Sequence, residues 1–284
     1  MKKQKDLTTG SIFKSLVSLA WPIIMANILQ TMYQLIDTFW LGRLGANAVA
    51  SVSLSFPILF LVLSLGGGLT LAGTVIVAQH KGANNQQKVN FSSSQTVMVI
   101  FLISILLAVV GYFSASQLMK FVGAGPECFQ DSVDYFQVSS WGFIFLFMFF
   151  VFQSLMRGIG EVFMPMYIVL ATVLLNLVLD PLFIFGYGPI EGQGVAGAAV
   201  ASIITQGLSA VAGLWILFRG SYGIRIKLSQ MKPDFKWIKK LFQLGIPSSL
   251  DQSSRAAGMT VMVMLVTGYG SEIVAAYGVG ARIL

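Results

Sequence analysis

The sequence predicts an all-α protein that crosses a membrane many times, built as a six-helix N-terminal lobe followed by the start of a second, repeat-related lobe. Of its 284 residues, 56% are hydrophobic and only 10% are charged, whereas soluble domains carry about 25% charged residues. The mean hydropathy is +0.79. Long stretches hold no charge, and the beginning of the chain recurs near its end. Composition and charge spacing predict a polytopic membrane protein, and the repeat predicts two lobes.

Four stretches contain no Asp, Glu, Lys or Arg. They lie between Arg43 and Lys81, between Lys88 and Lys120, between Asp134 and Arg157, and between Glu191 and Arg219. Each is longer than the about 20 residues that a helix needs to cross the hydrocarbon layer. We expect helices at 12–42, 47–78, 89–119, 131–156, 164–186, 194–218 and 238–268, with an eighth that begins near Glu272.

Most Lys and Arg residues lie between these stretches. Loops rich in Lys and Arg favour the cytoplasmic side of a membrane. If the N-terminus is in the cytoplasm, Arg43 and Lys120 are the only basic loop residues that we expect on the outer side of the membrane. We therefore expect a multi-pass protein of the cell membrane, surrounded by lipid, with its N-terminus in the cytoplasm. In a bacterium, this membrane would be the inner membrane. The segment 1–5 is interpreted as a cytoplasmic leader to the first helix, because no cleavage site closes a short apolar core.

Charge and cysteine content exclude other classes of protein. The net charge of +7 does not indicate nucleic-acid binding, because no soluble basic domain carries it. The single cysteine, Cys128, excludes an internal disulfide framework and has no CxxC partner for a metal or redox site. The chain holds no nucleophile elbow, no HExxH and no aspartate-rich pair. The sequence therefore predicts neither an enzyme nor a metal or cofactor protein.

The end of the chain repeats its beginning. A shift of 225 positions places Lys14, Leu16, Leu19, Pro22, Gly45, Val49, Ala50 and Ile58 on Lys239, Leu241, Leu244, Pro247, Gly270, Val274, Ala275 and Ile283. Six helices separate the two copies, so both run in the same direction, as the parallel repeats of two-lobed transporters do. We predict an N-terminal lobe at 1–222, a basic cytoplasmic linker at 223–237 and the start of a second lobe at 238–284. Unless the biological unit is a dimer of such pieces, we expect this chain to be part of a twelve-helix protein.

The first predicted helix carries a polar stripe. Asn27, Gln30, Gln34 and Asp37 share one helix face, with Tyr33 at its rim. Amides of this kind often serve as hydrogen-bonding glue between membrane helices, and that alternative is open for Asn27 and Gln34. A carboxylate in lipid costs about 3 kcal/mol or more, so Asp37 predicts a proton or cation site, with a structural hydrogen bond as the alternative.

The fifth predicted helix repeats this pattern. Thr172, Asn176 and Asp180 lie four residues apart on one face. Counted from the inner end near Pro165, Asn176 is about 16 Å deep and Asp180 about 22 Å. Asp37 is at a compatible height, so we expect Asp37, Asn176 and Asp180 to converge on a cavity as a site for H⁺ or Na⁺. The alternative for Asp180 is a helix-end hydrogen bond before the proline that follows it.

Three further features have both a functional and a structural interpretation. Pro22 removes an amide from the first helix and predicts a hinge, although membrane helices also tolerate proline. The glycines at 66–68 predict close helix packing or flexibility, since no phosphate-loop motif accompanies them. Asp251 and Arg255 are four residues apart, a spacing that suits mutual neutralisation; a role in substrate or ion binding stays open.

Several of these residues together resemble the multidrug and toxic compound extrusion (MATE) family over essentially the whole chain. The similar segments are 33–38 (Tyr-Gln-Leu-Ile-Asp-Thr) leading into Gly42, 156–160 (Met-Arg-Gly-Ile-Gly) ending in Pro165, and the pattern Asn176-x3-Asp180-Pro181. They look most like the DinF-like branch.

The resemblance implies two six-helix bundles around a V-shaped cavity. It implies a monomeric secondary antiporter that exports cationic or amphipathic small molecules by alternating access, driven by inward flow of H⁺ or Na⁺ and without another cofactor. The family's cation site carries onto Asp37, Asn176 and Asp180, and its cavity onto Gln30, Tyr33, Gln34, Gln153 and Thr172. Where some branches carry a glutamate on the seventh helix, this chain has Arg255. The alternative is a lipid-linked-oligosaccharide flippase of the same superfold, which requires a strongly basic cavity.

Overall fold

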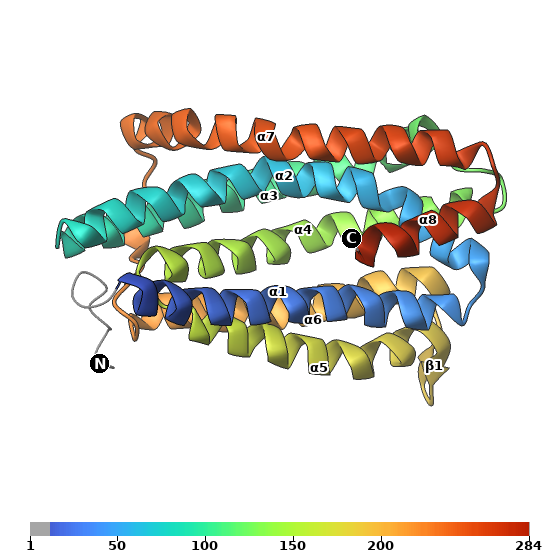
Figure 1. Cartoon of the computed structure of the whole chain (residues 1–284), viewed down its shortest axis with the longest axis horizontal. Helices are drawn as coiled ribbons and strands as arrows, with labels where there is room; N and C mark the ends of the chain where they lie inside the picture. The colour runs from blue at the N-terminus through green and yellow to red at the C-terminus, as the bar shows by residue number, and fades with distance from the viewer. Residues whose placement is uncertain (1–11, 284) are drawn as a thin grey trace.

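The computed structural model describes residues 12–283, apart from the side chains of residues 12, 14, 15, 190, 255, 256, 260, 271 and 281–283. The described chain forms long helices that run up and down side by side (Figure 1). The helices are α1 Ile12–Gly42, α2 Ala46–Gly82, α3 Gln86–Val122, α4 Phe129–Gly158, α5 Phe163–Phe185, α6 Gly194–Arg219, α7 Phe235–Thr267 and α8 Ser271–Ile283. Helices α1 to α6 are long and apolar enough to cross a membrane. The protein is therefore a multi-pass membrane protein, and the predicted fold class is confirmed.

Two short elements interrupt this pattern. Strands β1 (Gly186–Tyr187) and β2 (Ile190–Glu191) form an antiparallel hairpin between α5 and α6. This hairpin was not predicted from the sequence, although the Gly188-Pro189 pair at its tip is a turn signal. A 3₁₀ turn, η1 (Leu228–Gln230), lies between α6 and α7.

The core of the bundle is built around α4. Its largest fully buried side chains are phenylalanines one to two turns apart, namely Phe136, Phe143, Phe147 and Phe152. Glycines on the neighbouring helices make room for these rings, because a side chain at Gly66 would overlap Phe147 and one at Gly213 would overlap Phe152. The aromatic row thereby fixes how closely α2 and α6 approach α4.

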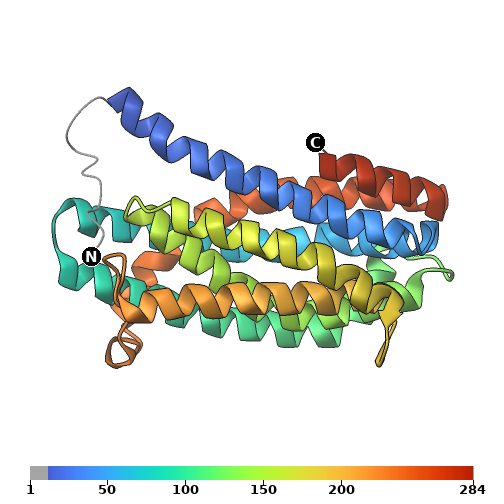
Figure 2. The ribbon, with the colours of Figure 1, turned by 90° about the horizontal axis from the view of Figure 1, so that it is seen from below.

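Helix α1 lies mainly along α5. Its N-terminal half stands away from the other helices, whereas its C-terminal half joins the bundle (Figure 2). The helix continues through Pro22 without interruption, so the hinge at Pro22 stays a prediction. Asp37 lies on the half that joins the bundle, next to the helix that carries Asp180.

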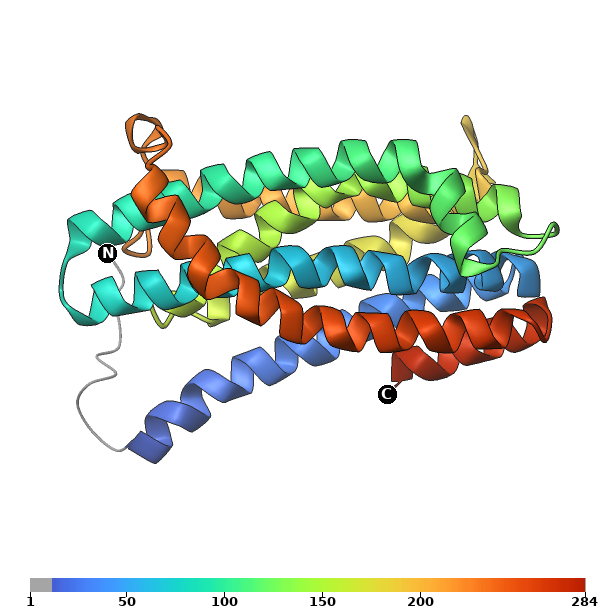
Figure 3. The same cartoon turned by 90° about the horizontal axis from the view of Figure 1, so that it is seen from above.

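Helix α7 packs along α2 and runs in the same direction as α1 (Figures 1 and 3). Two glycines allow the close approach, because a Cβ atom on Gly68 would overlap the backbone of Ser249 and one on Gly245 would overlap Leu69. The Ser249 hydroxyl donates to the carbonyl of Leu65 at 2.8 Å. The predicted packing role of the glycines at 66–68 is therefore confirmed.

Candidate functional site

A cavity of about 510 Å³ opens between α1, α2, α4, α6 and α7. Its polar lining residues are Gln30, Tyr33, Gln34, Asp37, Ser64, Tyr135, Ser139, Ser202, Gln206 and Gln252. Its apolar lining includes Phe56, Phe60, Leu63, Phe143, Leu146, Phe150 and Met259. Aromatic and methionine side chains adapt to ligands of different shape, while hydroxyl and amide groups can orient them. The lining is thus suited to amphipathic small molecules.

Tyr33 connects α1 to α6 at the wall of this cavity. Its hydroxyl donates to Ser202 Oγ at 2.9 Å and shares a hydrogen bond with Thr205 Oγ1 at 3.1 Å. These serine and threonine side chains belong to a polar face of α6. They therefore hold Tyr33 in place, and with it the stretch of α1 that leads to Asp37.

Asp37 lies at the cavity wall, where only 7% of its surface is exposed. Asp180 on α5 is fully buried, as is Asn176 one turn earlier. The Asp180 carboxylate interacts electrostatically with Asp37 and with Tyr33. The structure thus brings the three predicted ion-site residues together, with Asp37 facing the cavity and the pair on α5 behind it.

Asn176 and Asp180 on α5 bond each other and leave two of their side-chain oxygens without a partner among the described residues. Asn176 Nδ2 donates to Asp180 Oδ1 at 2.5 Å. The other two oxygens, Asp180 Oδ2 and Asn176 Oδ1, are buried and have no hydrogen-bond partner among the described residues. Buried polar atoms are nearly always satisfied, and these two oxygens on adjacent turns of α5 are exceptions to that rule.

Thr172 and Gln153 occupy different positions from those that the sequence predicts for them. Thr172 lines a small adjoining cavity rather than the main one, and its hydroxyl contacts Ser209 Oγ at 2.5 Å. Gln153 lines neither cavity, so its predicted role is corrected. The lining side chains of α4 end at Phe150, one turn earlier, and Gln153 Oε1 accepts a hydrogen bond from Arg157 at 2.8 Å.

The structure also bears on Asn27 and Gln34, for which a hydrogen-bonding role between helices was the alternative. Asn27 is exposed, so the hydrogen-bonding alternative for it finds no support among the described helices. Gln34 lines the cavity. The pairing of Asp251 with Arg255 depends on a side chain that lies outside the described part of the chain.

Sequence reasoning missed the contribution of α7. Gln252 and Met259 line the cavity, two turns apart, although they belong to the repeated segment of the chain. A glutamine inside an apolar helix is a usable signal, but the face that it occupies depends on how α7 packs on α2. Gln206 on α6 was also missed as a lining residue.

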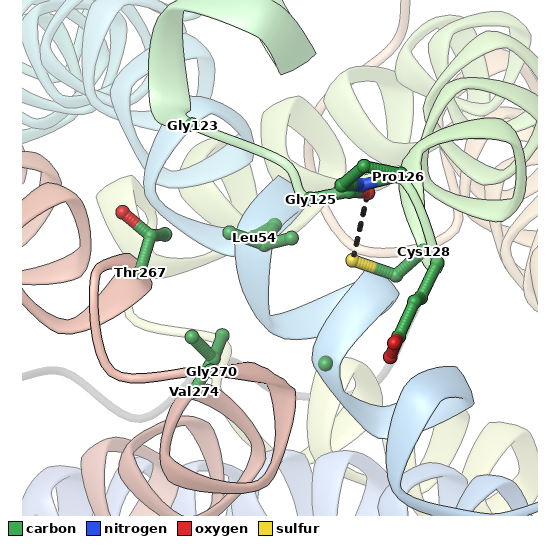
Figure 4. Close-up of a pocket in the computed structure, with 10 residues that line it drawn as sticks. Leu54, Gly123, Gly125, Pro126, Cys128, Thr267, Gly270 and Val274 are labelled. Carbon is green, nitrogen blue, oxygen red and sulfur yellow. Dashed lines mark hydrogen bonds between the residues drawn. The ribbon is translucent and has the colours of Figure 1, made fainter.

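A second cavity of about 340 Å³ lies where the α3–α4 loop meets the α7–α8 loop (Figure 4). Leu54, Pro126, Cys128 and Thr267 line it. The Cys128 thiol donates to the carbonyl of Gly125 at 3.7 Å. Burial raises the pKa of this thiol, which makes it a weak nucleophile.

Comparison with known proteins identifies the family. The MatE family model matches residues 22–182, a segment that contains Asp37, Asn176 and Asp180. The chain belongs to the MatE family. The resemblance in the sequence is thereby confirmed at the level of the family.

Two curated relatives align with nearly the whole chain. "Probable multidrug resistance protein YpnP" of Bacillus subtilis (strain 168) is 29% identical over 282 residues, which are 99% of this chain and 62% of the relative. "Multidrug export protein MepA" of Staphylococcus saprophyticus is 25% identical over 276 residues, which are 97% of this chain and 60% of the relative. This MatE chain therefore spans about 60% of the length of the relatives that it matches.

Solved structures of the family have the same fold. An outward-facing structure of a multidrug resistance MATE family transporter matches with a TM-score of 0.84 and 26% identity, over 100% of this chain and 62% of that one. An inward-facing structure matches with a TM-score of 0.81 and 25% identity, over 92% of this chain and 61% of that one.

Proposed function

We propose that this MatE chain forms the N-terminal lobe and the first two helices of the second lobe of a secondary active exporter. The whole protein would expel cationic or amphipathic small molecules from the cell in exchange for H⁺ or Na⁺. The names of the curated relatives support the export of drugs. The cavity between α1, α2, α4, α6 and α7 supports an amphipathic substrate.

The observation that carries the proposal is the buried pair Asn176 and Asp180 behind Asp37. Its two unpartnered oxygens can receive a proton or contribute oxygen ligands to Na⁺, the atoms that hard cations prefer. Asp180 with Asn176 would hold the ion, and Asp37 would connect the ion site with the cavity. No Lys or Arg is among the described lining residues of that cavity, so the basic pyrophosphate site of a flippase finds no support there.

The exchange follows from the electrostatics of the site. Two carboxylates in a medium of low dielectric attract any cation in the cavity. An ion that binds at Asp180 cancels one negative charge and weakens the hold of Asp37 on a cationic substrate. The ion and the substrate therefore compete, and alternating access turns this competition into antiport.

Alternating access requires two conformations and a defined orientation. The similarity to both an inward-facing and an outward-facing family structure supports two states, with Pro22 as the hinge of α1. The loops α2–α3, α4–α5 and α6–α7 lie at one end of the bundle (Figure 1). These loops and the helix ends beside them hold most of the basic residues. We assign this end to the cytoplasm of a bacterial cell, with lobes divided at the linker 223–237.

Transport by the full-length protein in vesicles tests the proposal. A pH gradient and a Na⁺ gradient are imposed in separate experiments, and uphill movement of a fluorescent dye is recorded. We expect at least one gradient to drive accumulation in wild type, and neither to drive it in Asp37→Asn. If Asp37→Asn accumulated the dye at the wild-type rate, Asp37 would not belong to the coupling site. If neither gradient drove accumulation in wild type, the protein would not be an H⁺ or Na⁺ antiporter.

A further inference from the structure

The segment between α6 and α7 is held against the beginning of α3. Gln95 is fully buried and donates from Nε2 to the carbonyls of Gln230 at 2.7 Å and Lys232 at 2.6 Å. Its Oε1 accepts from the amide of Asp234 at 3.3 Å. One side chain of α3 thus binds three backbone groups of the linker, which gives the linker a fixed course.

Two more side chains of α3 continue this attachment. Asn90 Oδ1 accepts from the amide of Arg225 at 3.0 Å, and Ser94 Oγ accepts from the amide of Lys227 at 3.2 Å. Ile224 and Ile226, which alternate with these basic residues, are buried. The alternation turns Arg225 and Lys227 outward.

The outward side of the linker combines basic and apolar side chains. Leu228 is 73% exposed and Phe235 is 82% exposed. They lie among the exposed residues Arg225, Lys227, Lys232 and Lys236, and we call these six residues the linker surface. The one acid of the segment, Asp234, accepts from the amides of Lys236 and Trp237 at the start of α7. Asp234 is therefore engaged as a helix cap, and the surface has an excess of positive charge.

The linker surface is attached to α3 beside the start of the apolar stretch of that helix. The residues of α3 that hold it, 86–95, directly precede the apolar run 97–113, which is long enough to fill most of the hydrocarbon layer. Figure 3 shows the segment standing out sideways from the bundle, while the α2–α3 turn reaches further along the helix axes. A segment in this position faces the membrane surface beside the bundle rather than open water beyond it.

We infer that the linker surface binds the anionic headgroups of the surrounding leaflet, with Leu228 and Phe235 inserted at the interface. Basic side chains close to an anionic leaflet attract it, and apolar side chains among them bury at the boundary of the acyl chains. Because the linker joins the two predicted lobes, bound lipid would hold their connection at a fixed depth. The site is separate from the ion site at Asp180, and either can fail without the other.

Spin labels at single cysteines test this inference in the full-length protein. Cys128→Ser removes the one cysteine of these 284 residues, and every cysteine in the rest of the full-length protein is replaced by serine as well. Labels are then placed by Leu228→Cys or Phe235→Cys. Ala83→Cys at the α2–α3 turn serves as the water reference, and Leu106→Cys on the exposed apolar face of α3 as the hydrocarbon reference. Collision rates with oxygen and with a water-soluble nickel chelate give the depth of each label. Nanodiscs contain phosphatidylcholine alone or with about 30 mol% phosphatidylglycerol, and both leaflets are alike, so orientation does not affect the result.

With phosphatidylglycerol, we expect both linker labels to lie between the two references and their nickel accessibility to fall by about twofold relative to phosphatidylcholine. The combined variant Arg225→Gln, Lys227→Gln and Lys232→Gln should lose this response. The matched variant Lys81→Gln with Lys88→Gln should keep it. Soluble glycerol phosphate added to phosphatidylcholine discs should produce no shift, which separates lipid from free phosphate.

Two results would overturn the inference. Linker labels that match the Ala83 reference in both lipids would mean that the surface faces water and is open to a cytosolic partner. A response to phosphatidylglycerol that persists in the combined glutamine variant would mean that the basic side chains do not cause it. An unchanged Leu106 reading in every variant verifies that the protein is folded and inserted.

Discussion

Two polar regions inside the bundle differ in how their side chains are satisfied. Where α2 meets α7, the Ser64 and Ser253 hydroxyls bond each other at 2.8 Å, and Ser249 donates to a backbone carbonyl. Between α1 and α5, Asp180 Oδ2 and Asn176 Oδ1 have no such partner among the described residues. The three serines at the seam of α2 and α7 are satisfied by protein groups, whereas the Asp180 pair retains two open oxygens. This difference between the seam of α2 and α7 and the Asp180 pair is the one that the proposed ion site explains.

The largest effect that we expect is the loss of coupling in Asp180→Asn. The amide keeps the shape of the side chain but cannot take up a proton and no longer carries charge. One elementary charge moved through about 150 mV can sustain an about 300-fold gradient of an uncharged substrate. We predict that the variant sustains no gradient in vesicles while it expresses at the wild-type level. Poor expression instead of lost transport would favour the structural role of Asp180 beside Pro181.

The seam between α2 and α7 should respond to volume rather than to charge. Gly68→Leu would drive a side chain into the backbone of Ser249, and overpacking of this kind costs about 1–3 kcal/mol. We predict a lower midpoint of thermal unfolding in detergent. The matched variant Gly82→Ala, which meets no atom within 4 Å, should leave the midpoint nearly unchanged. Equal midpoints for the two variants would show that α7 does not pack against α2 in this way.

Tyr33→Phe should have the smallest effect. It removes the hydroxyl that bonds Ser202 and Thr205, and such bonds between membrane helices contribute about 0.6 kcal/mol on average. Thr205 keeps its own bond to the carbonyl of Ser202 at 3.0 Å, so no threonine hydroxyl is left without an acceptor. We predict a slightly lower unfolding midpoint and retained, weaker accumulation of dye. Complete loss of transport would assign the hydroxyl to the ion path itself.

The positions of the helices could be predicted from the sequence because charge-free stretches and membrane thickness constrain them. Helix α2 continues to Gly82, past its predicted end at 78, because polar residues such as His80 and Lys81 end an apolar stretch without ending the helix. The meeting of Asp37 with Asp180 followed from their similar depth on two apolar helices. Depth alone left open which neighbour each helix would face.

The remaining parts of the site depend on packing between distant segments. Gln252 reaches the cavity because glycines let α7 lie close against α2, and no local pattern encodes that choice of neighbour. Gln153 had the right residue type and lies on a helix that lines the cavity, but Arg157 on the next turn binds it. Four points stay predictions. They are the division into two lobes at the linker 223–237, the DinF-like branch, the monomeric state and the coupling ion.

Competition between a substrate and an ion tests the central claim most directly. The affinity of the purified full-length protein for a fluorescent monocationic dye is measured by equilibrium titration, as a function of pH and of Na⁺ concentration. We predict that the coupling ion lowers the affinity of wild type by about tenfold, which corresponds to about 1.4 kcal/mol of coupling between the two sites. In Asp180→Asn the affinity should no longer depend on that ion. A wild-type affinity that responds to neither ion, or an undiminished response in Asp180→Asn, would contradict the account.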